Sequence, residues 1–148
     1  MSDELLGVIR VVGTGFVPAH EELFFIPDRV IVARTGGGRS YALGLFAVGL
    51  QVDAKHKELR TLPTESVLKA DKNNYAILNS EIKKIEINKK HGILSLQIET
   101  KDKKRKWYAL GVIEKEEETS KEVSKGQLSD YAKILKPIFG GKLSFTPW

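Results

Sequence analysis

Apolar and polar residues alternate with a period of two along much of the second half of the chain. In the segment 93–100, Leu94, Leu96 and Ile98 fall on one face and polar residues on the other, as in a half-buried strand. The neighbouring segments that we interpret as strands and turns are Tyr75–Leu78, Glu81–Lys90, the turn Lys90-His91-Gly92, the charged turn Lys101–Lys104 and Lys106–Val112. We therefore expect an antiparallel meander with one buried apolar face and one basic face. Its two charged turns should lie near each other.

The first half predicts a strand over Leu5–Val12 and then a β-hairpin. Leu23–Ile26 and Val30–Ala33 are rich in β-forming residues, and the dipeptide Pro27-Asp28 between them is typical of a turn. The glycine-rich segment Thr35–Ser40 follows. Because consecutive glycines carry much conformational freedom, we expect the sheet to end there.

The remaining segments predict helices. Tyr41–Leu62 contains no proline and is interpreted as one helix, apolar at first and charged later. A short helix should follow Pro63, with Thr64 as its N-cap. In the segment 127–139 apolar residues recur at helical spacing. Pro137 should end or kink this C-terminal helix, since proline cannot donate a backbone hydrogen bond.

The segment Tyr41–Leu50 is apolar on all sides, so we expect it to be buried against something. As a helix it would be about 15 Å long, half the hydrocarbon thickness of a bilayer. Three interpretations remain open: a core helix, a homodimer seam, or a segment that dips into a membrane interface. Its candidate contact residues are Leu43, Gly44, Leu45, Phe46, Ala47, Val48 and Leu50.

Two short motifs carry a family resemblance. They are the hairpin FFIPDRVIVAR and the segment ILNSEIKKI, in which Leu78 stands where proline is usual. With the C-terminal helix they resemble the pleckstrin-homology/GRAM-like superfamily, over Leu23–Ala33 and Tyr75–Ile138, in particular bacterial and archaeal members with a glycine-rich apolar insert. The resemblance implies an α+β fold in one domain, 1–148. That fold is a bent antiparallel β-sandwich or barrel with a C-terminal capping helix and an inserted apolar helix (insert about 36–70). It implies a recognition module without catalytic residues.

Charge is concentrated in the second half. The net charge is +5, and the segment from Lys83 to Lys106 contains nine Lys or Arg residues and three acidic residues. Such a stretch attracts polyanions. Strand alternation turns either Trp107 or Tyr108 outward, and the outward one is the candidate to stack on a base or insert at a headgroup. The candidate polyanion-binding residues are Lys83, Lys84, Lys89, Lys90, Lys101, Lys103, Lys104, Arg105, Lys106 and Trp107.

Residues that could carry catalysis or bind a metal are sparse. There are no cysteines, and His20, His56 and His91 show no metal-ligand spacing, so each is expected at the surface. The pair Glu21-Glu22 lies in a polar context without a partner pattern. We expect no enzyme, no metal and no cofactor. Gly37, Gly38 and Arg39 are candidates for a weak anion site, although a flexible hinge is the favoured interpretation there because GxxxxGK[ST] is absent.

These observations predict a cytoplasmic binding or adaptor module with no small-molecule substrate. The N-terminus begins with acids and lacks the apolar core of a signal peptide. We expect the protein to be a homodimer whose basic loops dock on RNA or a ribosomal surface. The alternative is a peripheral membrane module that binds anionic lipid at the inner membrane face through the basic patch and Tyr41–Leu50. The abundance of lysine and glutamate is typical of thermophile proteins.

Overall fold

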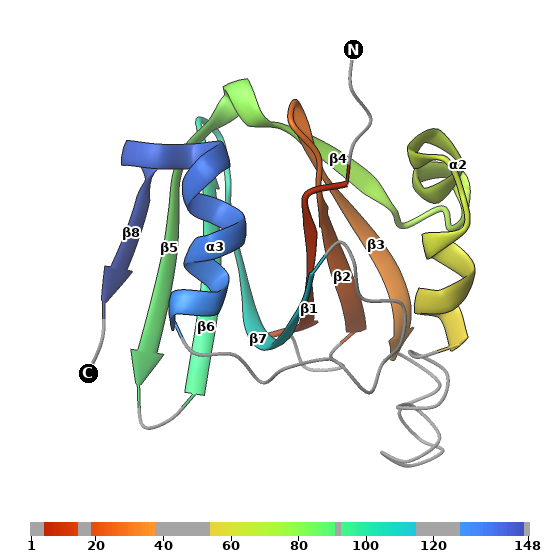
Figure 1. The fold of residues 1–148 in the computed structure, drawn as a ribbon, viewed down its shortest axis with the longest axis horizontal. Helices are drawn as coiled ribbons and strands as arrows, with labels where there is room; N and C mark the ends of the chain where they lie inside the picture. The colour runs from red at the N-terminus through yellow and green to blue at the C-terminus, as the bar shows by residue number, and fades with distance from the viewer. Residues whose placement is uncertain (1–4, 15–18, 38–53, 91–92, 115–127, 147–148) are drawn as a thin grey trace.

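The computed structural model describes residues 5–14, 19–37, 54–90, 93–114 and 128–146. Its strands form one mostly antiparallel sheet in the order β4-β3-β2-β1-β7-β6-β5-β8 (Figure 1). The strand bounds are Gly7–Gly13 (β1), Ala19–Phe25 (β2), Arg29–Gly37 (β3), Tyr75–Leu78 (β4), Ile82–Lys90 (β5), Ile93–Thr100 (β6), Lys104–Glu114 (β7) and Leu143–Thr146 (β8). The α+β class predicted from the sequence is confirmed.

Strand β7 joins two antiparallel meanders. Its first residues, from Lys104 to Tyr108, pair with β6, and its residues from Trp107 to Glu114 pair with β1. The register with β1 shifts between Arg10 and Val11, as at a β-bulge, which increases local bending. Figure 1 shows β7 curving from one half of the sheet to the other. This bend turns the inner faces of β1–β4 and β5–β7 toward a common core.

The inner core holds the alternating apolar residues of both meanders together with helix α3, Leu128–Phe139. Tyr131, Leu135 and Phe139 are buried in it, and the rings of Phe25 and Phe139 meet edge to face at 6.3 Å. Gly7 permits close approach of α3 to β1, because a Cβ there would lie 2.7 Å from Ile134 Cδ1. The predicted C-terminal helix is present over these residues, and it continues through Pro137.

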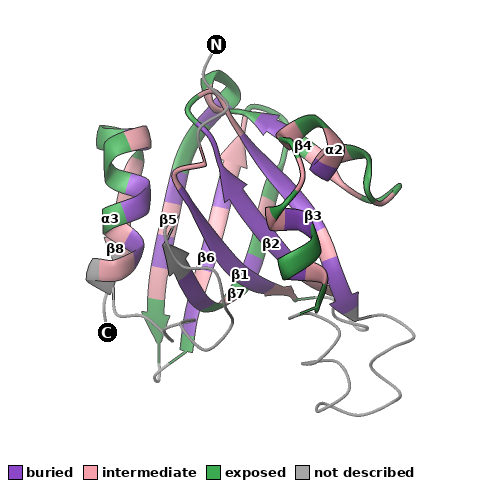
Figure 2. Cartoon of the chain, turned by 45° about the vertical axis from the view of Figure 1, so that its right-hand side comes forward, coloured by how far each residue is buried: buried purple, intermediate pink, exposed green. Residues whose placement is uncertain are grey.

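A second, outer core covers the other face of β1–β3. A helix over 54–60 and the short helix α2, Thr64–Lys69, pack against it. The buried residues of this core are Val8, Phe24, Ile26, Ile31, Ala33, Leu59 and Val67. Figure 2 shows β1–β3 buried along most of their length, whereas the two helices expose their outer sides. Strands β1–β3 are thus covered on both faces, while the outer face of β5–β7 carries exposed residues.

Several local predictions are corrected by the structure. Strand β3 continues to Gly37, because β2 supplies partners for Gly36 and Gly37 at His20 and Ala19, beyond a register shift at Thr35. A partner strand thus offsets the conformational freedom of glycine. Pro63, not Thr64, occupies the N-cap position of α2. Of the predicted helix Tyr41–Leu62, residues 54–60 are helical, and residues 38–53 lie outside the described residues.

The C-terminal tail adds an edge strand that the sequence did not predict. Strand β8 runs parallel to β5, with Leu143 opposite Ile85 and Phe145 opposite Ile87. Phe145 is half-buried and packs against the inner core. Across the described ranges, no helix has the length and apolarity needed to cross a bilayer.

The anchoring of α3 predicts a dependence of stability on alkaline pH. Burial, and secondarily the Asp130 carboxylate, raises the pKa of Tyr131 from 10.0 to about 12. Because burial disfavours the charged phenolate, the neutral Tyr131 side chain contributes fully to the stability of the folded state below about pH 10. This contribution, roughly 2–3 kcal/mol, is lost as the pH rises toward 12. Urea unfolding at about pH 8 and at about pH 11 measures how much free energy of unfolding is lost between these two pH values. This loss should be smaller for Tyr131→Phe than for the wild type. Parallel losses would contradict this assignment.

Candidate functional site

The two charged turns of the second meander lie at opposite ends of β6, contrary to the prediction that they are neighbours. Lys89 and Lys90 pair with Leu94 and Ile93 at one end. At the other end, the turn 101–103 connects β6 to β7. Eight residues of strand separate the two ends, which corresponds to roughly 25 Å. Consecutive hairpins of an antiparallel meander necessarily turn at alternating ends, so the basic residues form two groups.

The larger group forms a surface that we call the lysine face. It comprises the exposed side chains of Lys83, Lys84, Lys101, Lys103, Lys104, Lys106 and Tyr108. Lys84 lies 3.6 Å from a Glu86 oxygen, and Lys104 lies 3.8 Å from a Glu99 oxygen. The other four lysines form no ion pair with the described residues. The face also contains Asp102 in its turn, so its excess of positive charge is moderate and is greatest around the unpaired lysines.

Tyr108, and not Trp107, is the outward aromatic of β7. Trp107 is 3% exposed and belongs to the inner core, whereas Tyr108 is 43% exposed. Trp107 therefore cannot stack on a base or insert at a headgroup. Arg105 also leaves the predicted outer patch, because its guanidinium carbon lies 5.0 Å from the centroid of the Tyr75 ring. Arg105 and Trp107 share the inner side of β7, as the two-residue period of a strand requires.

These inner residues belong to a polar cluster that we call the inner polar cluster: Glu21, Arg34, Tyr75, Arg105 and Trp107. Trp107 Nε1 donates a 2.9 Å hydrogen bond to Glu21 Oε1. Burial, and then the Glu21 charge, raises the pKa of Tyr75, while Arg105 and Arg34 act in the opposite direction. The cluster brings the hairpin β2–β3 together with β4 and β7, which are distant from it in sequence.

A second polar group, the buried ion chain, lies beneath the helix 54–60 on the outer face of β1–β3. Glu22 Oε2 accepts a 2.9 Å hydrogen bond from Arg10 Nε, and Glu22 Oε1 lies 2.6 Å from His56 Nδ1. Glu22 and His56 are fully buried. Because a carboxylate can only accept, His56 Nδ1 carries the proton. Nearby, burial and then the Arg10 charge lower the pKa of His20.

The buried ion chain corrects two predictions. His56 is not a surface histidine, and the pair Glu21-Glu22 does not lie in a polar context, since each carboxylate is buried with a partner. A usable signal was present in the sequence: Arg10 interrupts the apolar run GVIRVVG. A charged residue at an otherwise buried strand position usually requires a partner. The identity of that partner depends on pairing between distant segments.

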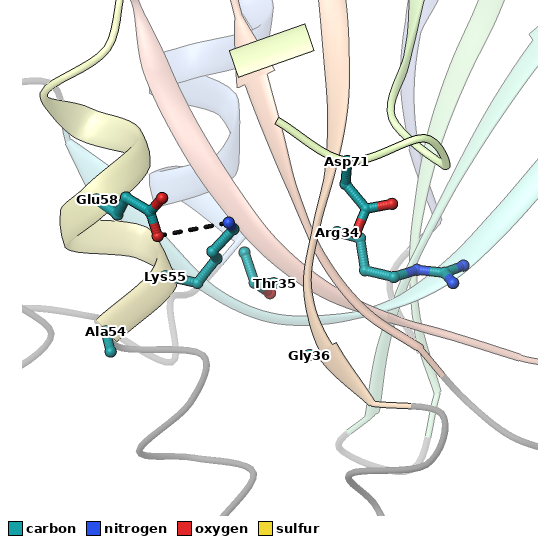
Figure 3. Close-up of a pocket in the computed structure, with 7 residues that line it drawn as sticks. All are labelled: Arg34, Thr35, Gly36, Ala54, Lys55, Glu58 and Asp71. Atoms are coloured by element: carbon teal, nitrogen blue, oxygen red, sulfur yellow. Dashed lines mark hydrogen bonds and ion pairs between the residues drawn. The ribbon is translucent and has the colours of Figure 1, made fainter. Parts of the chain in front are cut away.

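A cavity of about 430 Å³ opens at the end of β3, beside the helix 54–60 (Figure 3). Its lining includes Thr35, Lys55, Glu58 and Asp71. Lys55 Nζ and a Glu58 oxygen face each other at 3.4 Å, so these charges largely neutralise one another. Arg34 contributes the base of its side chain, and its guanidinium is directed away from Lys55 and Glu58. Among the described residues that line the cavity, no nucleophile is paired with a base.

The other predicted site residues are placed only in part. Gly37 is the last residue of β3, whereas Gly38 and Arg39 lie outside the described residues. The proposed dimer or membrane contacts, Leu43, Gly44, Leu45, Phe46, Ala47, Val48 and Leu50, also lie outside them, as does His91. In the described part of the chain, no three acidic or histidine side chains converge on a position for a metal ion.

Comparisons with known proteins found no match for the chain among protein-family models, curated proteins or solved structures. Inferences about function therefore depend on the placement of its side chains. Among the sites above, the lysine face combines exposure, positive charge and an outward aromatic. The buried ion chain and the inner polar cluster combine charge with burial.

Proposed function

We propose that the protein is a non-enzymatic binding module that docks single-stranded RNA on its lysine face. The observation that carries this proposal is the outward row of Lys104, Lys106 and Tyr108 on β7, beside the lysines of the turn 101–103. Lysines attract the phosphate backbone, and an exposed aromatic ring offers a stacking surface for a base. On β6, the uncharged Gln97 and Ser95 lie opposite Lys106 and Tyr108, whereas Glu99 lies opposite Lys104. Gln97 and Ser95 leave room for base contacts without like-charge repulsion.

We further propose that the fold is PH/GRAM-like. The four-stranded meander β1–β4, the three-stranded meander β5–β7 and the C-terminal helix α3 support this proposal. The parallel edge strand β8 goes beyond what the resemblance implies. A fold of this kind fixes no ligand by itself. The choice of RNA therefore comes from the lysine face.

RNA, alone or as part of a ribosomal surface, is favoured over a membrane by the small number of exposed apolar residues. Only four large apolar side chains of the described part are exposed: Leu78 on β4, Ile93 on β6, and Tyr108 and Leu110 on β7 beside the lysines. Membrane insertion requires a contiguous apolar surface. In this proposal Tyr41–Leu50 serves as a homodimer seam, on the basis of its sequence. A two-fold dimer would present two lysine faces and gain avidity for one RNA.

The test is equilibrium binding of a fluorescently labelled single-stranded RNA, followed by anisotropy over a range of salt concentrations. Replacing Lys101, Lys103 and Lys106 with glutamine should weaken binding at least tenfold. The slope of log affinity against log salt should fall by about 2, since each lost phosphate contact removes roughly 0.7. The matched control replaces Lys57, Lys69 and Lys72, which are exposed around the helices on the opposite half of the protein. It changes the net charge equally.

Equal weakening by the control variant would show that only net charge matters, and the lysine face would be rejected. Binding to anionic vesicles, with no binding to RNA, would replace the proposal with the membrane alternative. Vesicles of phosphatidylserine and phosphatidylcholine serve as the probe for that outcome. Tyr108→Ala adds an independent check, because loss of base stacking should weaken RNA binding by roughly 1–3 kcal/mol without changing the salt slope.

A further inference from the structure

The inner polar cluster contains hydrogen-bond donors that come from three strands and lie behind the lysine face. Arg34 comes from β3, Tyr75 from β4 and Arg105 from β7. The Arg105 guanidinium carbon lies 5.0 Å from the centroid of the Tyr75 ring, and the charges of both arginines oppose the rise in the Tyr75 pKa that burial and Glu21 cause. The three side chains are half-buried, so charges among them are screened less than charges at the surface. This arrangement differs from the fully exposed lysines on the outer face.

Arg34 is the member of the cluster with unused donors. Its Nε is buried and has no hydrogen-bond acceptor among the described residues, and the side chain forms no ion pair with them. Its neighbour across the strand pair, Glu21, already accepts from Trp107 Nε1. Figure 3 shows the guanidinium directed away from the carboxylate of Glu58. A buried guanidinium donor without an acceptor is costly, so an external anion would be favoured there.

The position of Arg105 indicates how such an anion could arrive. Arg105 is the second residue of β7, between the outward Lys104 and Lys106, and lies two residues after the lysine turn 101–103. The sheet separates its side chain from the lysine face. A nucleic-acid backbone that follows the outer face would not reach the inner side, whereas a chain end that passes around the turn could. A terminal phosphate also carries up to two negative charges, which suits two guanidinium groups.

We propose that Arg34, Tyr75 and Arg105 form a subsite for the terminal phosphate monoester of a single-stranded RNA. This inference rests on the proposed RNA binding by the lysine face. The guanidinium groups supply paired N–H donors, and the neutral Tyr75 hydroxyl supplies a third donor. Glu21 lies in the same cluster and opposes the phosphate by its negative charge, which limits the affinity of the subsite. The protein would thereby distinguish phosphorylated RNA ends from hydroxyl ends.

The experiment compares two pairs of otherwise identical oligonucleotides, one pair with a phosphate or hydroxyl at the 5′ end and one pair at the 3′ end. For one pair, the wild type should bind the phosphorylated member about tenfold more tightly. Arg34→Gln should abolish that preference while leaving the affinity for the hydroxyl form unchanged. Glu21→Gln should increase the preference, since its amide oxygen still accepts from Trp107 but the negative charge is gone. Lys133→Gln, exposed on α3, is the matched control and should preserve the wild-type preference.

The possible failures are distinguishable. Lysine-dependent RNA binding without any preference for a phosphorylated end would overturn the subsite and leave the proposed function intact. If no RNA binds, the proposed function fails. The subsite is then tested with inorganic phosphate by NMR, observing the Nε–H signal of Arg34 and the indole N–H signal of Trp107. Shifts that occur in the wild type and are absent in Arg34→Gln would support an anion site, and unchanged signals would reject it.

Discussion

Replacing Glu22 with alanine should destabilise the protein by about 3–5 kcal/mol, because it leaves the buried Arg10 and His56 without their shared carboxylate. Glu22 is fully buried and bonds both partners through separate oxygens, at 2.9 Å and 2.6 Å. Removing one member of a buried charged network exposes the full desolvation cost of the others. Urea unfolding near neutral pH, followed by circular dichroism, would measure the change in the free energy of unfolding.

Glu65→Ala is the matched control for this prediction. It removes a 2.8 Å ion pair with Arg29, but the Glu65 side chain is 64% exposed. Its loss should therefore cost less than about 1 kcal/mol. A further variant replaces all three members of the buried ion chain with apolar residues of similar size, and it should recover most of the lost stability. If Glu22→Ala behaved like Glu65→Ala, the carboxylate would not be the link between the helix 54–60 and the sheet.

Truncating Trp107 and Tyr108 to alanine should produce opposite phenotypes. Trp107→Ala should lose about 3–5 kcal/mol of unfolding free energy, since it removes a large core side chain. It also leaves the Glu21 carboxylate, which is 8% exposed, without the indole donor. Tyr108→Ala should lose less than about 1 kcal/mol, because its ring is largely outside the core. The two residues are adjacent, so chain position and strand propensity are nearly matched.

Trp107→Phe separates the two contributions at this position. The phenyl ring fills most of the space of the indole, and the remaining cost reports mainly the lost donor to Glu21, about 1–3 kcal/mol. RNA affinity provides the complementary measurement, since Tyr108→Ala should weaken binding and Trp107→Phe should not. A stable Trp107→Ala protein with impaired RNA binding would reverse the assignment of the two aromatic residues.

The two halves of the sheet differ in how their faces are covered. Strands β1–β3 are covered on both faces, by the inner core and by the helices of the outer core. Their outer face holds the buried ion chain, which anchors the helix 54–60. Among the described residues, strands β5–β7 are covered on the inner face, and their outer face carries the lysine face. The RNA binding that we propose concerns the half of the sheet that retains an exposed surface.

Local patterns predicted the regular elements because their causes are local. The alternation of Leu94, Leu96 and Ile98 identified a half-buried strand, and all three are buried in the inner core. The hairpin around Pro27-Asp28 and the C-terminal helix followed from turn chemistry and helical spacing. Predictions failed where a partner strand intervened. Thr35–Gly37 extend β3 because β2 lies beside them, and Leu143–Thr146 form β8 because β5 does.

The sequence by itself determined the strand meanders, the amphipathic C-terminal helix and the concentration of lysine between residues 83 and 106. It also required that Trp107 and Tyr108 face opposite sides of β7. Only the tertiary structure decided which of them is buried, since that depends on the face that β7 turns toward the inner core. It likewise decided that Glu22 meets His56, which lies 34 residues away. Periodicity encodes the conformation of a segment, whereas the partners of a buried charge are set by long-range packing and strand register.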